Sequence, residues 1–168
     1  MTERYARRVN DDAALVQIVD ARLAEAAGRS GHWLACHPGC CECCMGPFPI
    51  SEADAQRLRN GLAELKLHDP DRAAEIERRA REWSGNDEEA CPALDPANGT
   101  CELYAARPMT CRTFGPPVRC ESGELAICEL CFDGASPEEI EAAVVELDPE
   151  MLGQAEDENL TVASVLRA

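Results

Sequence analysis

The sequence predicts a mainly α-helical protein: a small helical domain in which two irregular, cysteine-rich loop regions converge on a metal site, with room for a short β-hairpin near residues 118–128. Two observations lead to this prediction. Apolar residues recur every three or four positions in segments at both ends and in the middle of the chain, as they do in amphipathic helices. The stretches between these segments are rich in cysteine, proline and glycine, and the last two interrupt regular structure.

The first predicted helix covers residues 10–28. Leu15, Ile18, Val19 and Leu23 recur at helical spacing, with acidic residues among them, so we expect them to pack on the core. Gly28 and Gly31 follow where the apolar pattern ends, as is common at the C-terminus of a helix.

Two further helices are predicted in the middle of the chain. Ser51 is a good N-cap, and Asp54 three residues later makes an approximate capping box. Asp69 and Pro70 begin the next helix, with proline at the first helical position. The two helices have the same apolar spacing, which suits an antiparallel pair. Their apolar stripes are Ala55, Leu58, Leu62 and Leu65 in the first helix and Ala73, Ile76, Ala80 and Trp83 in the second.

The C-terminal part of the chain is predicted to be irregular up to Phe132 and helical afterwards. Short strands are expected around Val118 and residues 125–127. Ser136 and Pro137 are typical of the N-cap and first position of a helix. The apolar face of this helix would consist of Ile140, Ala143, Val144 and Leu147.

A last helical segment is predicted to begin at Asp148 and Pro149. The chain is then a single domain of residues 1–168, a length that can bury a core of its own. Its cysteine-cluster, metal-binding core would cover 36–131, and flanking helices would cover 10–28 and 136–166.

The formal net charge of −16 excludes two classes of partner. Nucleic acids and anionic membranes are bound through clustered lysine and arginine, so we expect neither. No signal peptide and no apolar run of the ~18 residues that a membrane span needs is apparent, so we expect a cytoplasmic protein. Metal ions are the predicted partners, and a protein partner is left open.

Eleven cysteines give the chain its most unusual feature, and five of them fall within residues 36–44. In the reducing cytoplasm, such clusters bind metals or catalyse reactions more often than they form disulfides. Thiolates are soft ligands that suit zinc, copper(I) and iron–sulfur clusters. The predicted metal ligands are Cys36, Cys40, Cys43, Cys44, Cys91, Cys101, Cys111, Cys120, Cys128 and Cys131.

Ten thiols exceed what one tetrahedral ion needs, so two sites or one polynuclear site fit the count better. Cys41 is the expected spare, a small side chain packed in the interior. Arg107 and Arg112 flank Cys111. They would either lower thiol pKa values and balance the charge of the thiolates, or cap helix carbonyls and pair with surface acids.

The spacing of Cys40, Cys43 and Cys44, followed by C-P-A-L-D from Cys91, G-T-C-E-L-Y from Gly99 and R-P-M-T-C-R-T-F from Arg107, resembles the YkgJ-type cysteine-cluster family, the zinc- or iron-chelating CxxCxxCC domain. The resemblance extends over about residues 36–131. The first cysteine of that family would fall at His37, which lies beside Cys36. We favour Cys36 as the ligand there, with His37 as the alternative.

The resemblance implies a zinc or iron centre, and a related domain in flagellin lysine methylases is expected to carry an iron–sulfur cluster. Together with the surplus of thiols, this favours iron or an iron–sulfur cluster, with zinc as the alternative. The expected function is metal binding at a structural or redox-active site. Other interpretations are an iron–sulfur oxidoreductase, an accessory domain for protein modification, and a metal store or chaperone. No catalytic motif is recognisable, so no catalytic residue is assigned.

Overall fold

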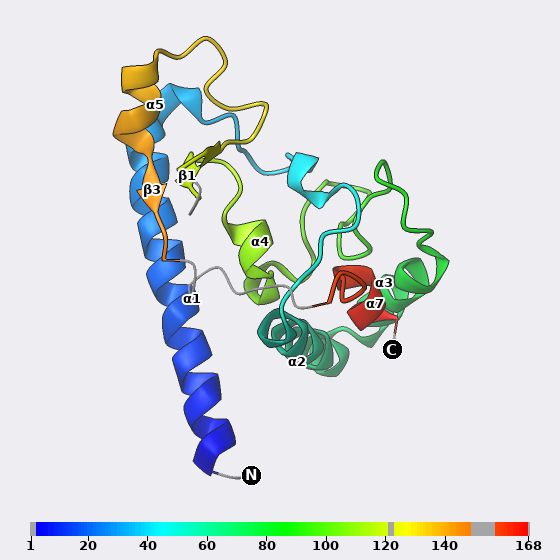
Figure 1. The fold of residues 1–168 in the computed structure, drawn as a ribbon. Coiled ribbons are helices and arrows are strands. Elements are labelled where there is room, and N and C mark those ends of the chain that lie inside the picture. Colours follow the sequence, from blue (N-terminus) through cyan, green and yellow to red (C-terminus); the bar gives the residue numbers. More distant parts are fainter. Residues whose placement is uncertain (1–2, 121–122, 149–156, 168) are drawn as a thin grey trace. The chain divides into compact units, whose positions relative to one another are not determined.

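The computed structural model describes residues 3–120, 123–148 and 157–167, with side chains from residue 12 onwards (Figure 1). In this described part, six α-helices, three short 3-10 helices and a three-stranded sheet are separated by irregular loops, which confirms the mainly α-helical prediction. None of the helices described combines the length and the apolar character needed to cross a membrane.

The chain divides into two compact units. Unit 1 contains Met1–Cys36 and Arg112–Leu152, and unit 2 contains His37–Cys111 and Gly153–Ala168. The short helix α4 (Met109–Arg112) spans the point in the sequence where unit 2 gives way to unit 1. The single-domain organisation and the core at 36–131 remain predictions, because two compact units can belong to one domain.

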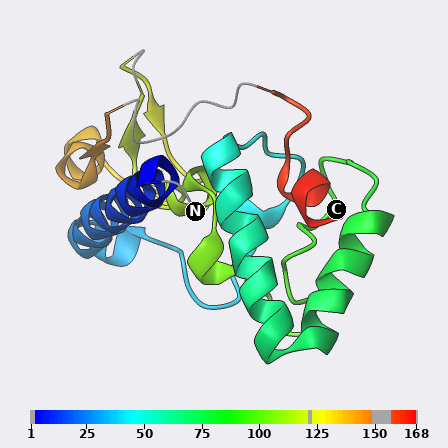
Figure 2. The same cartoon turned by 90° about the horizontal axis from the view of Figure 1, so that it is seen from below.

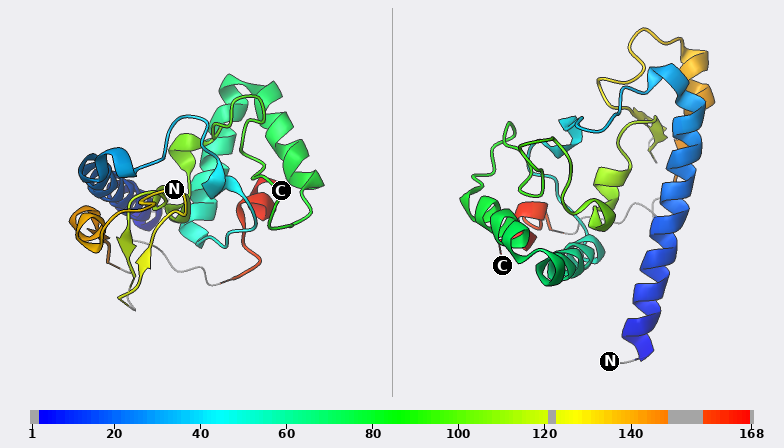
Figure 3. Two further views of the ribbon diagram at one scale, coloured as in Figure 1. Left: turned by 90° about the horizontal axis from the view of Figure 1, so that it is seen from above. Right: turned by 180° about the vertical axis from the view of Figure 1, so that it is seen from behind.

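Unit 2 is built on the helices α2 (Glu52–His68) and α3 (Pro70–Glu82), which form a V-shaped hairpin (Figure 2). The short helix α7 (Val162–Leu166) packs against both of them (Figure 3). Two 3-10 helices, η2 (Glu42–Cys44) and η3 (Tyr104–Ala106), lie in the loops. The core combines the predicted stripes of α2 and α3 with residues of the loops and of α7: Ile50, Ala55, Leu58, Leu62, Ala73, Ile76, Ala80, Ala93, Leu103, Ala106, Val165 and Leu166.

Local capping signals determine where the helices of unit 2 begin. The Ser51 side chain accepts a hydrogen bond from the Asp54 N–H, and the Asp54 side chain accepts one from the Ser51 N–H, which completes the predicted capping box. Asp69 caps α3, and Pro70 is its first residue. Trp83, predicted as part of the apolar stripe, lies just beyond α3 as its C-cap.

Unit 1 is built on α1 (Glu3–Ser30), which continues into the 3-10 helix η1 (Gly31–Trp33). The helix α5 (Pro137–Ala143) and the strand β3 (Val145–Glu146) lie along α1 (Figure 1). Arg29 fixes this arrangement, because its guanidinium donates to the carbonyls of Ala142 and Val144 at 3.0 Å each.

A small sheet completes unit 1, with the strand order β2-β1-β3. β1 (Val118–Arg119) pairs antiparallel with β2 (Leu125–Ala126), which confirms the predicted hairpin. It also pairs parallel with β3, a strand that the sequence did not predict.

Three sequence-based boundaries differ from the structure. α1 begins at Glu3 instead of residue 10 and passes through Gly28. The helix from Ser136 ends at Ala143, so Val144 and Leu147 do not belong to its face. The Val145 N–H donates to Pro117 O at 2.9 Å and draws this segment into the sheet. The helical segment predicted from Pro149 lies largely outside the described residues.

Asp54 is the most heavily bonded carboxylate of unit 2, and we predict that Asp54→Ala destabilises the protein by about 3–5 kcal/mol. It is only 1 % exposed, and it accepts hydrogen bonds from the Met109 N–H at 2.9 Å and from Arg57 at 2.6 Å. Its loss leaves these donors buried and unpaired. Urea denaturation measures the effect, and Glu52→Ala is the matched control on the same helical turn.

Glu52 is exposed, so its ion pair with Arg59 contributes below about 1 kcal/mol. Equal losses in the two variants would contradict the assigned role of Asp54.

Candidate metal centre

Five thiols of unit 2 lie close enough to influence one another: Cys43, Cys44, Cys91, Cys101 and Cys111. Burial, with contributions from Cys101 and Cys43, raises the pKa of Cys91 to about 12. Burial likewise raises the pKa of Cys111 to about 12, with contributions from Cys91, Cys101 and Cys43. We call these five residues the unit 2 thiol cluster.

Backbone pairing brings the first two cysteine-bearing segments together. The Cys91 N–H donates to Cys44 O at 2.6 Å, and the Gly46 N–H donates to Glu89 O at 2.9 Å, so the loop after η2 runs antiparallel to the segment before Cys91. Cys43 and Cys44 are thereby held beside Cys91.

A turn after Cys91 brings Cys101 back alongside. The Glu102 N–H donates to Ala93 O at 2.8 Å, and Leu94 forms a β-bridge with Cys101. At the tip of this turn, Gly99 has φ +70°, and a Cβ added to it would lie 2.7 Å from Gly39 O. Only glycine allows the first cysteine loop to approach the turn this closely.

Cys43 and Cys44 are neighbours in the sequence, but their thiol pKa values are shifted in opposite directions. A hydrogen bond from the Cys44 thiol lowers the pKa of Cys43 to about 6, and the same bond raises the pKa of Cys44. The thiolate is the form that binds metals, so Cys43 is the best-prepared ligand of the cluster near neutral pH.

Arg107 supplies positive charge to the cluster. Its guanidinium carbon lies 3.5 Å from the centre of the Tyr104 ring, and its Nε donates to Tyr104 O at 3.0 Å. Burial raises the pKa values of Cys101 and Cys111, and the charge of Arg107 opposes that rise.

Of the two roles expected for the arginines that flank Cys111, Arg112 has the second: it pairs with an acidic side chain. Its Nη1 lies 2.8 Å and 2.7 Å from the two carboxylate oxygens of Asp20 on α1, within unit 1. The two arginines that flank Cys111 thus serve different purposes: Arg107 acts on the thiols and Arg112 holds an ion pair.

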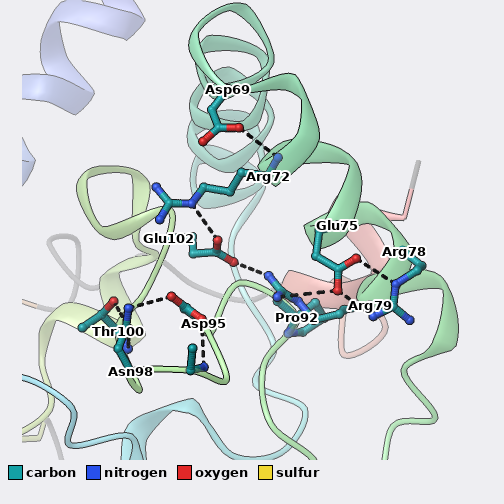
Figure 4. A network of polar contacts seen from close by, with 11 residues as sticks. Asp69, Arg72, Glu75, Arg78, Arg79, Pro92, Asp95, Asn98, Thr100 and Glu102 are labelled. Carbon is teal, nitrogen blue, oxygen red and sulfur yellow. Dashed lines mark hydrogen bonds and ion pairs between the residues drawn. The ribbon is translucent and has the colours of Figure 1, made fainter.

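A partly buried ion network connects α3 to both segments that carry Cys91 and Cys101 (Figure 4). Arg79 donates from Nε to Pro92 O at 2.9 Å and binds the Glu102 carboxylate through Nη2. Arg72 binds the other oxygen of Glu102 at 2.9 Å. Pro92 and Glu102 each directly follow a cysteine, so this network fixes the backbone beside two thiols of the cluster. Sequence analysis did not single it out, and the only signal was a charged residue next to Cys101.

The remaining cysteines are placed differently. Cys40 and Cys41 lie in the first loop of unit 2, where the Cys40 N–H donates to His37 O at 3.0 Å. His37 is exposed, with its Nδ1 2.9 Å from Pro38 O. The other predicted ligands belong to unit 1 and are Cys36, Cys120, Cys128 and Cys131.

All eleven cysteines are in the thiol form, not in disulfides. In the described part of the chain, no three side chains of His, Cys, Asp or Glu converge closely enough to hold a metal ion as they are placed. The thiols of the unit 2 thiol cluster are therefore near one another but do not form a complete metal site. Metal binding would require rotation of their side chains. Its donor set, thiols beside one guanidinium, fits zinc and iron and does not fit magnesium or calcium. The ten predicted ligands remain a prediction.

A search of protein-family models matches residues 35–132 to the CxxCxxCC family, described as "Putative zinc- or iron-chelating domain". The match covers more than half of the chain and contains every one of its cysteines, and the chain belongs to this family. Neither the curated proteins nor the solved structures gave a match. The predicted resemblance is confirmed, and the chain is a cysteine-rich member of a zinc- or iron-chelating family.

We predict that Glu102→Gln lowers the free energy of unfolding by about 3 kcal/mol, because it leaves Arg79 and Arg72 without their shared carboxylate. The Glu102 side chain is 7 % exposed. Glu82→Gln is the matched control, since Glu82 is exposed and pairs with Arg78 on the same helix, a contact worth below about 1 kcal/mol. Urea denaturation compares the two variants, and a Glu102 variant as stable as its control would argue against the network.

We also predict that Arg107→Gln weakens metal binding about tenfold, equivalent to about 1.4 kcal/mol, because it removes the positive charge beside the thiols. Arg107→Lys should retain most of the affinity. Competition with a chromophoric chelator measures the change, and Arg59→Gln, an exposed arginine on α2, is the control. If both glutamine variants bound metal equally well, Arg107 would have no electrostatic role.

Proposed function

We propose that the protein binds iron, preferably as an iron–sulfur cluster, or zinc at the unit 2 thiol cluster, and that this centre has a structural or redox role. One observation carries the proposal: five thiols from four segments of unit 2 lie near one another and near Arg107, with the Cys91 N–H bonded to Cys44 O and Leu94 bridged to Cys101. Isolated buried cysteines behave as small apolar side chains and need no such cation.

The charge of the cluster supports this assignment. Four thiolates around one divalent ion leave two negative charges in a partly buried place, which is costly without compensation. Arg107 reduces that cost, and the stacking on Tyr104 holds its guanidinium in position. In such a centre, Cys91, Cys101 and Cys111 would serve as ligands together with Cys43 or Cys44.

Two metals remain candidates because different observations favour each. The cluster offers more thiols than the four that one zinc ion requires, which favours an iron–sulfur cluster with a spare thiol. The hydrogen-bonded backbone and the Arg79–Glu102 contact favour a rigid, structural zinc site. A bound iron–sulfur cluster would supply one-electron transfer, and zinc would supply a crosslink alone.

We place this function in the cytoplasm as part of the same proposal. Cysteines in the thiol form, as all eleven are here, persist where glutathione and thioredoxin keep them reduced. Metal binding would protect the most reactive of them, Cys43, whose pKa is lowered to about 6 by the hydrogen bond from Cys44.

We predict that Cys91→Ser/Cys101→Ser removes the metal of this centre and lowers the thermal stability of the protein. A structural metal site contributes on the order of 10 kcal/mol to folding, so chelation of the unmodified protein should have the same effect. Elemental analysis, the visible spectrum and circular dichroism are measured on protein purified without oxygen. Cys41→Ser, which changes the expected spare cysteine, is the matched control.

A brown protein that contains iron and acid-labile sulfide would identify the iron–sulfur form, and a colourless protein with stoichiometric zinc would identify the zinc form. A double variant that retains all the metal of the unmodified protein would disprove the proposed ligands.

A further inference from the structure

The C-x-x-C segment of unit 1 is a hydrogen-bonded turn. The Cys131 N–H donates to Cys128 O at 2.8 Å, and Glu129 and Leu130 form the turn between them. A β-turn brings the Cα atoms of its first and fourth residues within about 7 Å of each other. The Cα atoms of disulfide-bonded cysteines lie about 4.4–6.8 Å apart. The backbone of this turn therefore holds the two cysteines in the range of separation that a disulfide requires.

Both cysteine side chains of the turn contact the same apolar cluster. Cys131 is a buried member of this cluster together with Phe132 and Ala143, and Cys128 packs against it. Two side chains that pointed to opposite sides of the turn could not share these neighbours. Rotation about the χ1 angles can then bring the two sulfurs into contact without a change in the backbone.

The two cysteines differ in their exposure to solvent. Cys131 is 5 % exposed, whereas Cys128 is half-buried. The tip of the turn is open, because Glu129 is exposed and Leu130 is 50 % exposed. Thiol–disulfide exchange needs one sulfur that an external molecule can reach and a second sulfur that can then attack the first. Cys128 has the exposure of the first sulfur, and Cys131 has the shielding of the second.

The fold of unit 1 fixes the Cys131 end of the turn. The Phe132 N–H donates to Trp33 O at 2.9 Å, and the Ala135 N–H donates to Phe132 O at 3.1 Å. Phe132 has φ 62°, and in the described part of the chain it is the only residue other than glycine with a positive φ. A bulky residue keeps this strained conformation only where its surroundings impose it. The shape of the turn is therefore set by packing within unit 1.

We propose that Cys128 and Cys131 are a redox-active dithiol, which exchanges with the disulfide of another molecule and closes a bond between its own two sulfurs. The Cys128 thiolate attacks one sulfur of the external disulfide and forms a mixed disulfide, and the other sulfur leaves and takes up a proton. The Cys131 thiolate then attacks the Cys128 sulfur and releases the second thiol. The dithiol loses two electrons and two protons, and the external disulfide gains them.

This activity goes beyond the metal centre proposed for unit 2. It uses thiols of unit 1, and it needs no metal ion. Two sulfurs complete a disulfide, but they do not fill the four positions around a zinc ion. Where thiols are kept reduced, the dithiol is the resting form and the disulfide is a transient form.

Glu129 makes a direct test possible, because it separates the two cysteines in the sequence. A protease that cleaves after glutamate produces the fragments 125–129 and 130–138, which stay joined only through a bond between Cys128 and Cys131. The full-length protein is equilibrated at a series of ratios of glutathione to glutathione disulfide, alkylated, digested without reduction and analysed by mass spectrometry. We expect the joined fragments to form and disappear reversibly, along the curve of one two-electron couple.

Single variants test the roles of the two sulfurs. Cys131→Ser lacks the second sulfur, so we expect a stable glutathione adduct on Cys128. Cys128→Ser should show neither joined fragments nor an adduct on the shielded Cys131. Cys120→Ser is the matched control, since it changes an exposed cysteine of the same unit, and it should match the unmodified protein. An adduct on Cys131 in place of Cys128 would overturn the assigned roles.

Two measurements on the unmodified protein keep the test independent of variants that fail to fold. The fragments would disprove the proposal if they were joined at no ratio, or if they were joined only after a chelator had removed bound metal, since the two sulfurs would then be metal ligands. In concentrated urea the turn no longer holds the cysteines together, so the folded protein should form the bond at a more reducing ratio. Equal ratios would contradict the role of the turn. The centre in unit 2 is judged by its metal content, so these failures leave the proposed function standing.

Discussion

The burial of several thiols beside one another is the constraint on which unit 2 depends. Burial, together with the neighbouring cysteines, raises the pKa values of Cys91 and Cys111 to about 12, so that a thiolate at either position is costly. The bond from the Cys91 N–H to Cys44 O holds two cysteine-bearing segments together through the backbone, and the Arg79–Glu102 contact holds the segment after Cys101 to α3. Arg107 lowers the electrostatic cost directly.

Capping residues and apolar periodicity were sufficient to predict most of the helices. Ser51, Asp69 and Ser136 cap helices as expected, because capping depends on residues within one turn. The third strand could not be predicted in this way, since the parallel pairing of Val118 with Val145 joins residues far apart in the sequence. Apolar periodicity did not indicate the early start of α1, because the first residues of α1 are mostly charged residues and alanine, which form helices without an apolar face.

Cysteine spacing indicated the chemistry of the candidate site but not its arrangement. It identified the thiols of both units, yet it grouped Cys36 with its sequence neighbours, whereas the structure packs it on Gly115. The roles of Arg107 and Arg112 were also open, because Asp20, which decides the role of Arg112, lies 92 residues away in the sequence. Contacts of this range depend on the tertiary fold, and a spacing pattern carries no information about them.

The two units are built from alternating segments of the chain, and the order of these segments has a consequence during synthesis on the ribosome. Unit 2 needs Val165 and Leu166 of α7 for its core, but the second segment of unit 1 leaves the ribosome before α7 does. Neither unit is therefore complete when the first cysteine loop emerges. A nascent chain exposes Cys40 to Cys44 well before the segments that would shield them, so these thiols need reducing conditions during synthesis, and the proposed metal would bind late.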